Sequence, residues 1–416
     1  MKKHFKYNSY KTVNGIEVYH LNTNTELFSL NLGIKIGSKY ERYEEKGLSH
    51  FLEHMVFKGT KKRDNIMINE DIEELAGYSN AFTSYSDTVF KFMALNEEFE
   101  NALEILSDII VNPIFPEEEF LKEKEVIISE IKSNLDNIEE YAYYRISKEA
   151  FLNSFLRWDI AGEIEDIVRY SVEDVEKYYE KYYLPNNTVI VIASSFDDEY
   201  VFSKVEEYFK TWDQREVKLL DIKREKNISK EYSIYSQEFD ISNILYLYSY
   251  ENLSIREELA LSIISYSLGE NSNSHLFKRL REEKGMTYEV YSDLDNSEDV
   301  KLLYIYTELS RDNILSAKEI IDNTIKEVKS GKLVNEKSVK LMKKIIKTAL
   351  ASTLLDPQNT SDYLISQILD GRDIYEFERN LEIIDSLKTE EIIEVAKKVL
   401  KNPTVQIIEG GMRIED

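Results

Sequence analysis

The chain has 416 residues, of which 42% are hydrophobic and 12% aromatic, and its formal charge is −25. The length suggests two domains, and the apolar and aromatic content excludes a disordered chain because it can form sizeable cores. The negative charge argues against binding to nucleic acid or to anionic membranes, both of which would repel the chain.

The sequence contains no cysteine, so it offers no disulfide, thiol nucleophile or thiolate metal site, and a bound metal would need His, Asp or Glu ligands. Residues 1–14 include lysines but lack the apolar segment of a signal peptide. No run of about 18 apolar residues that would span a membrane is found. We therefore expect a cytoplasmic protein that does not associate with a membrane.

In the first half, the hydrophobic spacing changes between strand-like and helical patterns. The predicted elements, in chain order, are strands at 16–21 and 27–36, helices at 46–58 and 69–76, strands at 78–85 and 88–94, amphipathic helices within 101–131, further helices to about 183, and a strand at 188–193. The strands at 78–85 and 88–94 face each other across Ser86-Asp87.

The second half repeats this order. It is predicted to contain strands within 232–250, a helix at 256–268, strands at 287–293 and 302–309, a helix-rich segment and a strand at 404–408. The segments 101–131 and 316–346 also resemble each other in their helical patterns. This duplication predicts an α+β fold with two homologous α/β sandwich domains, each with a mainly antiparallel sheet packed against helices. We expect the domains at 1–212 and 230–416, joined by a polar linker at 213–229.

The segment GLSHFLEHMVFKGT contains His50, Glu53 and His54 in the pattern His-x-x-Glu-His. On a helix, positions i, i+3 and i+4 share one face, so both imidazoles can bind one ion and Glu53 can reach a water beside it. With only five histidines in the chain, a chance occurrence is uncommon. The alternative is a surface helix on which these three side chains are simply solvated. We predict a zinc site with Glu53 as the general base.

A catalytic zinc needs a third protein ligand, and without a cysteine or another nearby histidine this ligand must be a carboxylate. The predicted helix at 117–134 offers Glu119, Glu123, Glu125 and Glu130. Glu123 and Glu130 are seven residues apart and therefore share a helix face. The spacing alone does not choose between these two, because a charged helix face is usually solvated.

The sequence resembles the pitrilysin and insulin-degrading-enzyme family over essentially its whole length, and especially the half-length branch that includes mitochondrial processing peptidase and bacterial relatives. Four segments carry the resemblance: GSKYERYEEKGLSHFLEHMVFKGTKKR (37–63), GYSNAFTSYSDT (77–88), EKEVIISEI (123–131) and HLFKRLREEKGMTYEV (275–290). In that family the third zinc ligand is a glutamate about 76 positions after the second histidine, which implies Glu130. A family glutamate seven residues earlier supports the metal site from outside, and Glu123 matches it.

The resemblance also implies how a substrate would bind. In the family, an edge strand pairs with the substrate backbone and carries an Asn-Ala pair near the scissile bond, which Asn80 and Ala81 match. An Arg and a Tyr seven residues apart hold the substrate and the oxyanion, and Arg281 and Tyr288 match them. From the residues alone, REEKG is a helix end capped by Gly285. Strand addition requires an extended substrate, which implies peptides or unfolded segments.

The chain departs from the family pattern at two places. Many relatives carry His-Pro-Leu-Gly where this chain reads NSFLRWDIAGE (153–163), and relatives often read Gly-Asp where it has Ser194-Ser195. The helix at 256–268 lacks His-x-x-Glu-His, so we expect one Zn2+ per chain, in the first domain, and the Arg-Tyr pair in the second. Full-length relatives fuse two such chains, which implies a homodimer here, with a heterodimer with a related chain as the alternative.

The leading hypothesis is a zinc endopeptidase that cleaves extended peptides or unfolded segments in an enclosed dimer chamber. One alternative is a non-catalytic scaffold or assembly subunit of the same family, although such members usually lose part of the metal-binding set that this chain keeps. Another is a dedicated leader-peptide maturation protease, which would share the chemistry and differ in its substrate.

Overall fold

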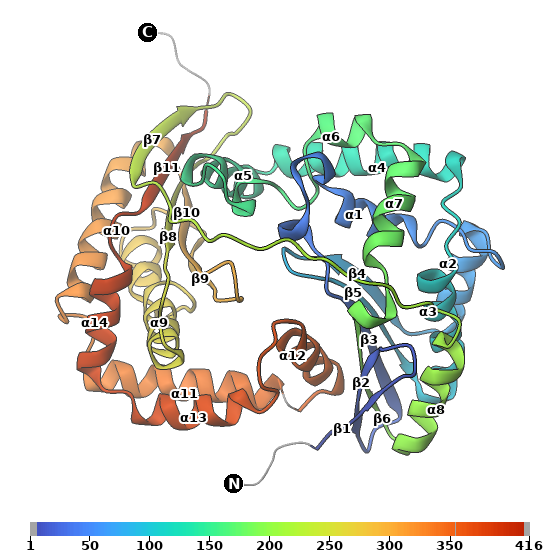
Figure 1. Ribbon diagram of the computed structural model, residues 1–416. Helices are drawn as coiled ribbons and strands as arrows, with labels where there is room; N and C mark the ends of the chain where they lie inside the picture. Colours follow the sequence, from blue (N-terminus) through green and yellow to red (C-terminus); the bar gives the residue numbers. More distant parts are fainter. Residues whose placement is uncertain (1–5, 354, 412–416) are drawn as a thin grey trace. The chain divides into compact units, whose positions relative to one another are not determined.

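The computed structural model describes residues 6–353 and 355–411, and its packing divides this part of the chain into two compact units (Figure 1). The first unit contains the residues up to Ile131, together with Asp159–Ile222 and Ala351–Ile374. The second contains Lys132–Trp158, Lys223–Leu350 and the residues from Tyr375 onward. Each unit holds one β-sheet with helices packed against it, in agreement with the predicted α+β fold.

The sheet of the first unit has six strands in the order β1-β2-β6-β3-β5-β4. The strands are β1 Asn8–Lys11, β2 Glu17–Asn22, β3 Leu27–Ile34, β4 Tyr78–Thr83, β5 Thr88–Leu95 and β6 Thr188–Ser194. Neighbours are antiparallel except β2 and β6. The central strands β3 and β6 are almost fully buried, which fits the nearly continuous apolar sequence of β6, whereas in β3 the apolar residues alternate with Ser29, Asn31 and Gly33. The last strand, β4, is largely exposed.

The sheet of the second unit repeats this topology with five strands, in the order β7-β11-β8-β10-β9. They are β7 Lys230–Tyr235, β8 Ser242–Ser249, β9 Val290–Asp295, β10 Leu302–Leu309 and β11 Thr404–Glu409. The one parallel pair, β7 with β11, occupies the place of β2 with β6. The repeated strand order confirms the predicted pair of α/β sandwiches with mainly antiparallel sheets.

Helices cover the sheets in both units. Those of the first unit are α1 Leu48–Met55, α2 Asn65–Glu74, α3 Phe99–Val111, α4 Glu117–Asp136, α6 Ile164–Arg169, α7 Val172–Tyr182, α8 Asp198–Phe209 and α12 Pro357–Leu369. Those of the second are α5 Ile138–Ala150, α9 Ile255–Leu268, α10 Ile314–Lys329, α11 Glu336–Thr353, α13 Glu376–Ser386 and α14 Thr389–Val399. Helices α4 and α11 each continue past a unit boundary.

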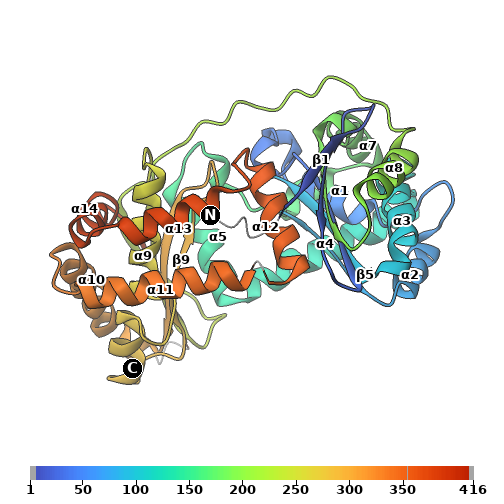
Figure 2. The same ribbon diagram turned by 90° about the horizontal axis from the view of Figure 1, so that it is seen from below.

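In each unit, one helix that packs on the sheet comes from the other half of the sequence. Helix α5, from the first half, packs on β8 and β11 (Figure 1). The Asn243 amide donates to the Ile138 carbonyl at 3.2 Å. Helix α12, from the second half, is coloured orange-red in Figure 2. It packs on β3 and β6, and the Asn31 amide donates to Asp362 at 2.8 Å. Each sheet is therefore covered partly by a helix that belongs to the other half of the sequence.

A few elements differ from the sequence-based prediction. The strand β1 was not predicted. The strand predicted at 287–293 begins only at Val290. Residues 213–229 contain no helix or strand. Within the described residues, none of the helices has the length and apolar character that would let it span a bilayer.

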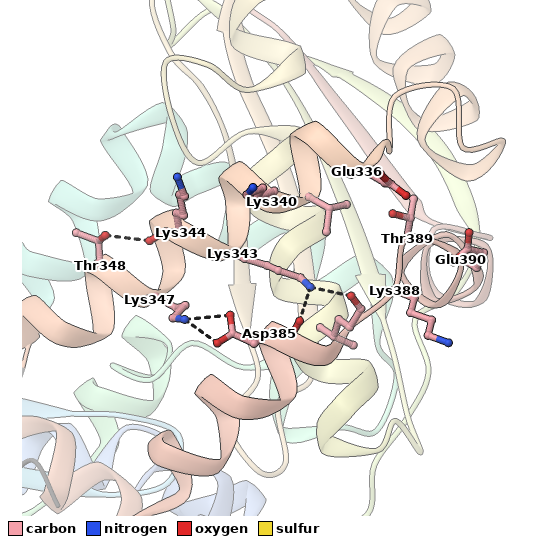
Figure 3. Close-up of a pocket in the computed structure, with 12 residues that line it drawn as sticks. Glu336, Lys340, Lys343, Lys344, Lys347, Thr348, Asp385, Lys388, Thr389 and Glu390 are labelled. Atoms are coloured by element: carbon pink, nitrogen blue, oxygen red, sulfur yellow. Dashed lines mark hydrogen bonds and ion pairs between the residues drawn. The ribbon is translucent and has the colours of Figure 1, made fainter. Parts of the chain in front are cut away.

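A groove of about 820 Å³ lies in the second unit beside α11 and the connection between α13 and α14 (Figure 3). Five lysines line it: Lys340, Lys343, Lys344, Lys347 and Lys388. The Lys343 ammonium donates to the carbonyls of Asp385 and Leu387, at 3.0 and 2.7 Å, and Lys347 pairs with the Asp385 carboxylate at 2.7 Å. These two amino groups therefore attach the C-terminal end of α13 to α11.

Candidate metal centre

Helix α1 presents two different faces. Leu48, Phe51, Leu52 and Met55 are buried and recur at the spacing of one helix face. The Phe51 ring stacks on Phe120 of α4, with ring centroids 5.0 Å apart. This apolar face buries one side of α1 in the first unit, and the two histidines lie on another side, where they meet glutamates of α4.

The start of α1 is held by Glu41, a residue that the sequence analysis did not single out. Its carboxylate accepts hydrogen bonds from the backbone N–H groups of Gly47, at 2.9 Å, and Ser49, at 2.7 Å. Gly47 has a φ of 84°, in the left-handed region that favours glycine. Burial raises the pKa of Glu41 to about 7, against the hydrogen bonds from Ser49 and Gly47 and the charge of Lys46, which lower it.

Three potential ligands from α1 and α4 converge. Nε2 of His50 lies 3.2 Å from Nε2 of His54, and the Glu130 carboxylate lies 3.6 Å from the former and 3.7 Å from the latter. One ligand atom from each residue falls within 4.8 Å of the other two. The two histidines are one helical turn apart, and Glu130 completes the set from the facing helix. The structure thus brings together the three residues expected to bind zinc.

The chemistry of this set suits zinc. Burial, and then the neighbouring His54, lower the pKa of His50 to about 3, so its imidazole is neutral and has a lone pair to offer. Nδ1 of His50 is buried and has no hydrogen-bond partner among the described residues, which leaves Nε2 as the nitrogen that faces the other ligands. Two imidazoles and one carboxylate match the three protein ligands of catalytic zinc sites.

Glu123 holds His54 from the side opposite the ligand atoms. Oε1 of Glu123 lies 2.8 Å from Nδ1 of His54, and Oε2 lies 2.8 Å from Nζ of Lys58. Burial acts to raise the pKa of Glu123, but the hydrogen bonds from His54 and Lys58 outweigh it and hold that pKa below its usual value. An ionised carboxylate accepts a hydrogen bond from the Nδ1–H group of His54. The Nε2 lone pair of His54 is therefore directed towards the ligand set.

The other glutamates of α4 lie outside this arrangement. Glu119 accepts hydrogen bonds from Asn65, at 3.0 Å, and Lys122, at 2.8 Å, and Glu125 is exposed. The geometry therefore separates the two positions that helix spacing left open: Glu130 lies with the ligand atoms, and Glu123 lies behind His54.

Glu53 is nearly buried, with 8% of its surface exposed, on the same side of α1 as the histidines. Burial raises the pKa of its carboxyl above the usual value. Its Oε2 accepts a hydrogen bond of 2.7 Å from the hydroxyl of Thr83, the last residue of β4. The carboxyl group is therefore fixed between α1 and the end of the edge strand.

The edge strand β4 pairs with β5 on one side, in a register that sets Asn80 opposite Lys91 and Ala81 opposite Phe90. β4 stands last in the strand order, so its outer backbone groups face no other strand of the described chain. Asn80 is exposed and Ala81 is partly exposed. An unpaired edge of this kind can accept an extended peptide as a further strand.

Arg281 and Tyr288 contact each other in the second unit. Arg281 lies in a π-helical turn at Phe277–Glu282, and its guanidinium donates to the carbonyl of Tyr288 at 2.8 Å. The Tyr288 side chain is 92% exposed. The contact therefore involves the backbone of Tyr288 and leaves its phenol open to a ligand.

The Ser194-Ser195 departure has a structural consequence. Ser194 Oγ lies 2.9 Å from Nε2 of His20, whose Nδ1 lies 2.6 Å from Asp198. This Ser-His-Asp arrangement resembles a hydrolase triad, but both Ser194 and His20 are fully buried. No substrate can reach the hydroxyl, so the three residues join β2, β6 and α8 rather than form a second active centre.

Comparison with known proteins places these features in one family. The model of the insulinase family, peptidase family M16, matches residues 18–163, and the model of the M16 inactive domain matches residues 169–346. An uncharacterized zinc protease of Rickettsia felis is 29% identical over 99% of this chain and 98% of its own length. The uncharacterized zinc protease YmxG of Bacillus subtilis is 29% identical over 86% of this chain and 91% of its own length. A protease from Helicobacter pylori has the same fold, with a TM-score of 0.90, 20% identity, and coverage of 97% of this chain and 99% of that one.

Proposed function

We propose that this chain, which belongs to the insulinase family of peptidases (family M16), is a zinc-dependent endopeptidase that cleaves extended peptides or unfolded segments. The observation that carries the proposal is the convergence of His50, His54 and Glu130 next to the nearly buried Glu53. The neighbouring edge strand β4 adds a surface for an extended backbone.

In this proposal His50, His54 and Glu130 hold one Zn2+ per chain, and Glu123 orients His54 from behind. When bound, zinc supplies a Lewis acid that polarises a carbonyl group and acidifies water. Glu53 takes a proton from the attacking water while the water oxygen bonds to the scissile carbonyl carbon. Glu53 then passes this proton to the nitrogen of the leaving amine as the C–N bond breaks. The raised pKa of Glu53 suits a group that must both accept and donate a proton.

Substrate contacts follow from the exposed groups. The outer edge of β4 would pair with the substrate backbone near Asn80 and Ala81. The exposed Tyr288 would donate its phenol proton as a hydrogen bond to the developing oxyanion, with Arg281 as a second contact. We assign the metal and the base to a catalytic domain at 1–212 and the Arg-Tyr pair to a domain at 230–416. We further propose a homodimer with an enclosed chamber, in which this pair serves the metal site of the opposite copy.

The test compares wild type with Glu53→Gln on a quenched, unstructured peptide library, with zinc content measured on the same samples. Glu53→Gln is expected to keep zinc and lose cleavage by at least about 100-fold. Glu125→Gln, which changes an exposed glutamate of α4, serves as the matched control and is expected to cleave like wild type. Cleavage by Glu53→Gln at the wild-type rate would contradict the proposed mechanism.

One observation favours a second candidate. Residues 169–346 match the inactive-domain model of the family. The second candidate function is therefore that of a non-catalytic assembly subunit. Wild-type protein that binds zinc but cleaves no member of the peptide library would support this candidate. Cleavage confined to one kind of leader peptide would instead favour a maturation protease with the same chemistry.

A further inference from the structure

Glu53 is held by a neighbour that lies 30 positions away in the sequence. The Thr83 hydroxyl donates to Oε2 of Glu53 at 2.7 Å, and Glu53 is only 8% exposed. Among the described residues, Thr83 is the one hydrogen-bond partner of the Glu53 side chain. Its orientation therefore depends on Thr83, in addition to the backbone of α1.

The direction of this hydrogen bond follows from the protons available. An ionised carboxylate can only accept, and a threonine hydroxyl has one proton to give. The other hydroxyl near Thr83 is that of Thr88, at 3.5 Å, and Thr88 donates its own proton to the Ile36 carbonyl at 3.0 Å. The shorter, charge-assisted contact to Glu53 therefore takes the Thr83 proton. This hydrogen bond lowers the basicity of Oε2, so Oε1 is the more basic oxygen of the Glu53 carboxylate.

Thr83 is itself well fixed. It pairs with Thr88 at the closed end of the β4–β5 hairpin, and the next residue, Ser84, donates its backbone N–H to the Asp87 carbonyl at 2.7 Å. A β-branched side chain on a strand has restricted rotamers. Thr83 also ends the strand whose outer edge is free for a substrate backbone. The hydroxyl that contacts Glu53 thus belongs to the proposed substrate-binding strand.

We propose that Thr83 is a positioning residue, which engages Oε2 of Glu53 so that Oε1 takes the proton from the attacking water, and which links the substrate-binding edge strand to the general base. This inference rests on the proposed peptidase function. It predicts that the Thr83 hydroxyl affects turnover rather than substrate or zinc binding, because the hydroxyl contacts neither the ligand set nor the outer edge of β4.

The experiment compares Thr83→Val, Thr83→Ser and Thr88→Val with wild type on one peptide substrate. Thr83→Val, which keeps the shape but loses the donor, is expected to lower kcat by roughly 10-fold to 100-fold with KM and zinc content unchanged. Thr83→Ser restores the donor and is expected to recover most of this loss. Thr88→Val removes a buried hydroxyl that donates to a backbone carbonyl, so it is expected to lower the urea midpoint of unfolding but to leave kcat within about twofold.

A second measurement does not need activity. In metal-free protein, Thr83→Val is expected to lower the urea midpoint in the wild-type background and to change it much less in a Glu53→Leu background, because the partner is then absent. Equal shifts in both backgrounds, or a Thr83→Val enzyme with wild-type kcat, would overturn the inference and leave the proposed function intact. Wild type that fails to cleave any peptide would overturn the proposed function, and with it the catalytic meaning of this contact.

Discussion

Nδ1 of His54 lies 2.8 Å from Oε1 of Glu123, while the other oxygen of the same carboxylate lies 2.8 Å from Nζ of Lys58. This chain of contacts fixes the ring of one proposed zinc ligand through a glutamate that is itself held by a lysine. Loss of a residue that orients a metal ligand in this way typically weakens metal binding by about 10-fold to 100-fold.

Glu123→Gln is therefore expected to weaken zinc binding by about 10-fold to 100-fold, because a neutral amide is a poorer acceptor for the Nδ1 proton and loses the charge that holds Lys58. Competition with a chromophoric chelator measures this change. Glu119→Gln, one turn earlier on the same helix and bonded to Asn65 and Lys122, is the control. Equal zinc affinity for the two variants would show that Glu123 does not support the site.

Tyr288→Phe is expected to lower kcat by about 100-fold through loss of one donor to the oxyanion. Its side chain is 92% exposed, so the free energy of unfolding should change by less than about 0.5 kcal/mol. Steady-state kinetics and urea unfolding on the same samples separate the two effects. Tyr43→Phe changes another exposed tyrosine, 70% exposed, and should turn over like wild type. A Tyr288→Phe enzyme with unchanged kcat would remove Tyr288 from the mechanism.

Gly47→Ala is expected to destabilise the start of α1. Gly47 has a φ of +84°, and a Cβ there would lie 2.5 Å from the Ala161 carbonyl oxygen. Gly285 also has a positive φ, of +60°, but a Cβ there would meet nothing within 4 Å. Gly285→Ala should therefore cost about 1 kcal/mol of unfolding free energy, and Gly47→Ala about 3 kcal/mol because it adds a backbone clash. Equal costs by urea unfolding would argue against a tight contact at Gly47.

Glu41 predicts a pH-dependent contribution to stability. Burial raises its pKa from 4.5 to about 7, so the folded state binds its proton more tightly than the unfolded state. Its contribution is therefore complete below about pH 4.5 and is lost as the pH rises through about 7. By linkage, the loss is at most about 3 kcal/mol.

Comparison of wild type with Glu41→Gln isolates this contribution, since the other titrating groups are common to both proteins. The unfolding free energy of wild type minus that of the variant should fall between about pH 4.5 and 7, where Glu41 is ionised in the unfolded state but protonated in the folded state. A difference that stays constant or rises over this range would contradict the assigned pKa direction.

Prediction from the sequence succeeded for elements in which burial of one face gives a regular spacing of apolar residues. Strand β10 coincides with the predicted 302–309, and α9 starts within one residue of its prediction. Strand β1 escaped prediction because its four residues are all exposed and carry no apolar alternation. The exchange of α5 and α12 could not be predicted, because an amphipathic pattern indicates that a face is buried but not which sheet it contacts.

The site was predicted unevenly for a similar reason. His50, Glu53 and His54 lie within one helical turn, so local spacing revealed them, whereas the family resemblance was needed to choose Glu130. Lys58 follows the end of α1 and meets Glu123 of α4 only through tertiary packing. Thr83 and Glu41 reach α1 through tertiary packing and hydrogen bonding, and nothing in the local sequence marks such contacts.

The most direct test of the central claim is the zinc content of purified protein by elemental analysis, with wild type beside His54→Ala. We expect about one zinc per chain in wild type and its loss in the variant, with both proteins folded by circular dichroism. Wild type that contains no zinc and takes up none when zinc is added would contradict the claim that His50, His54 and Glu130 form a metal centre.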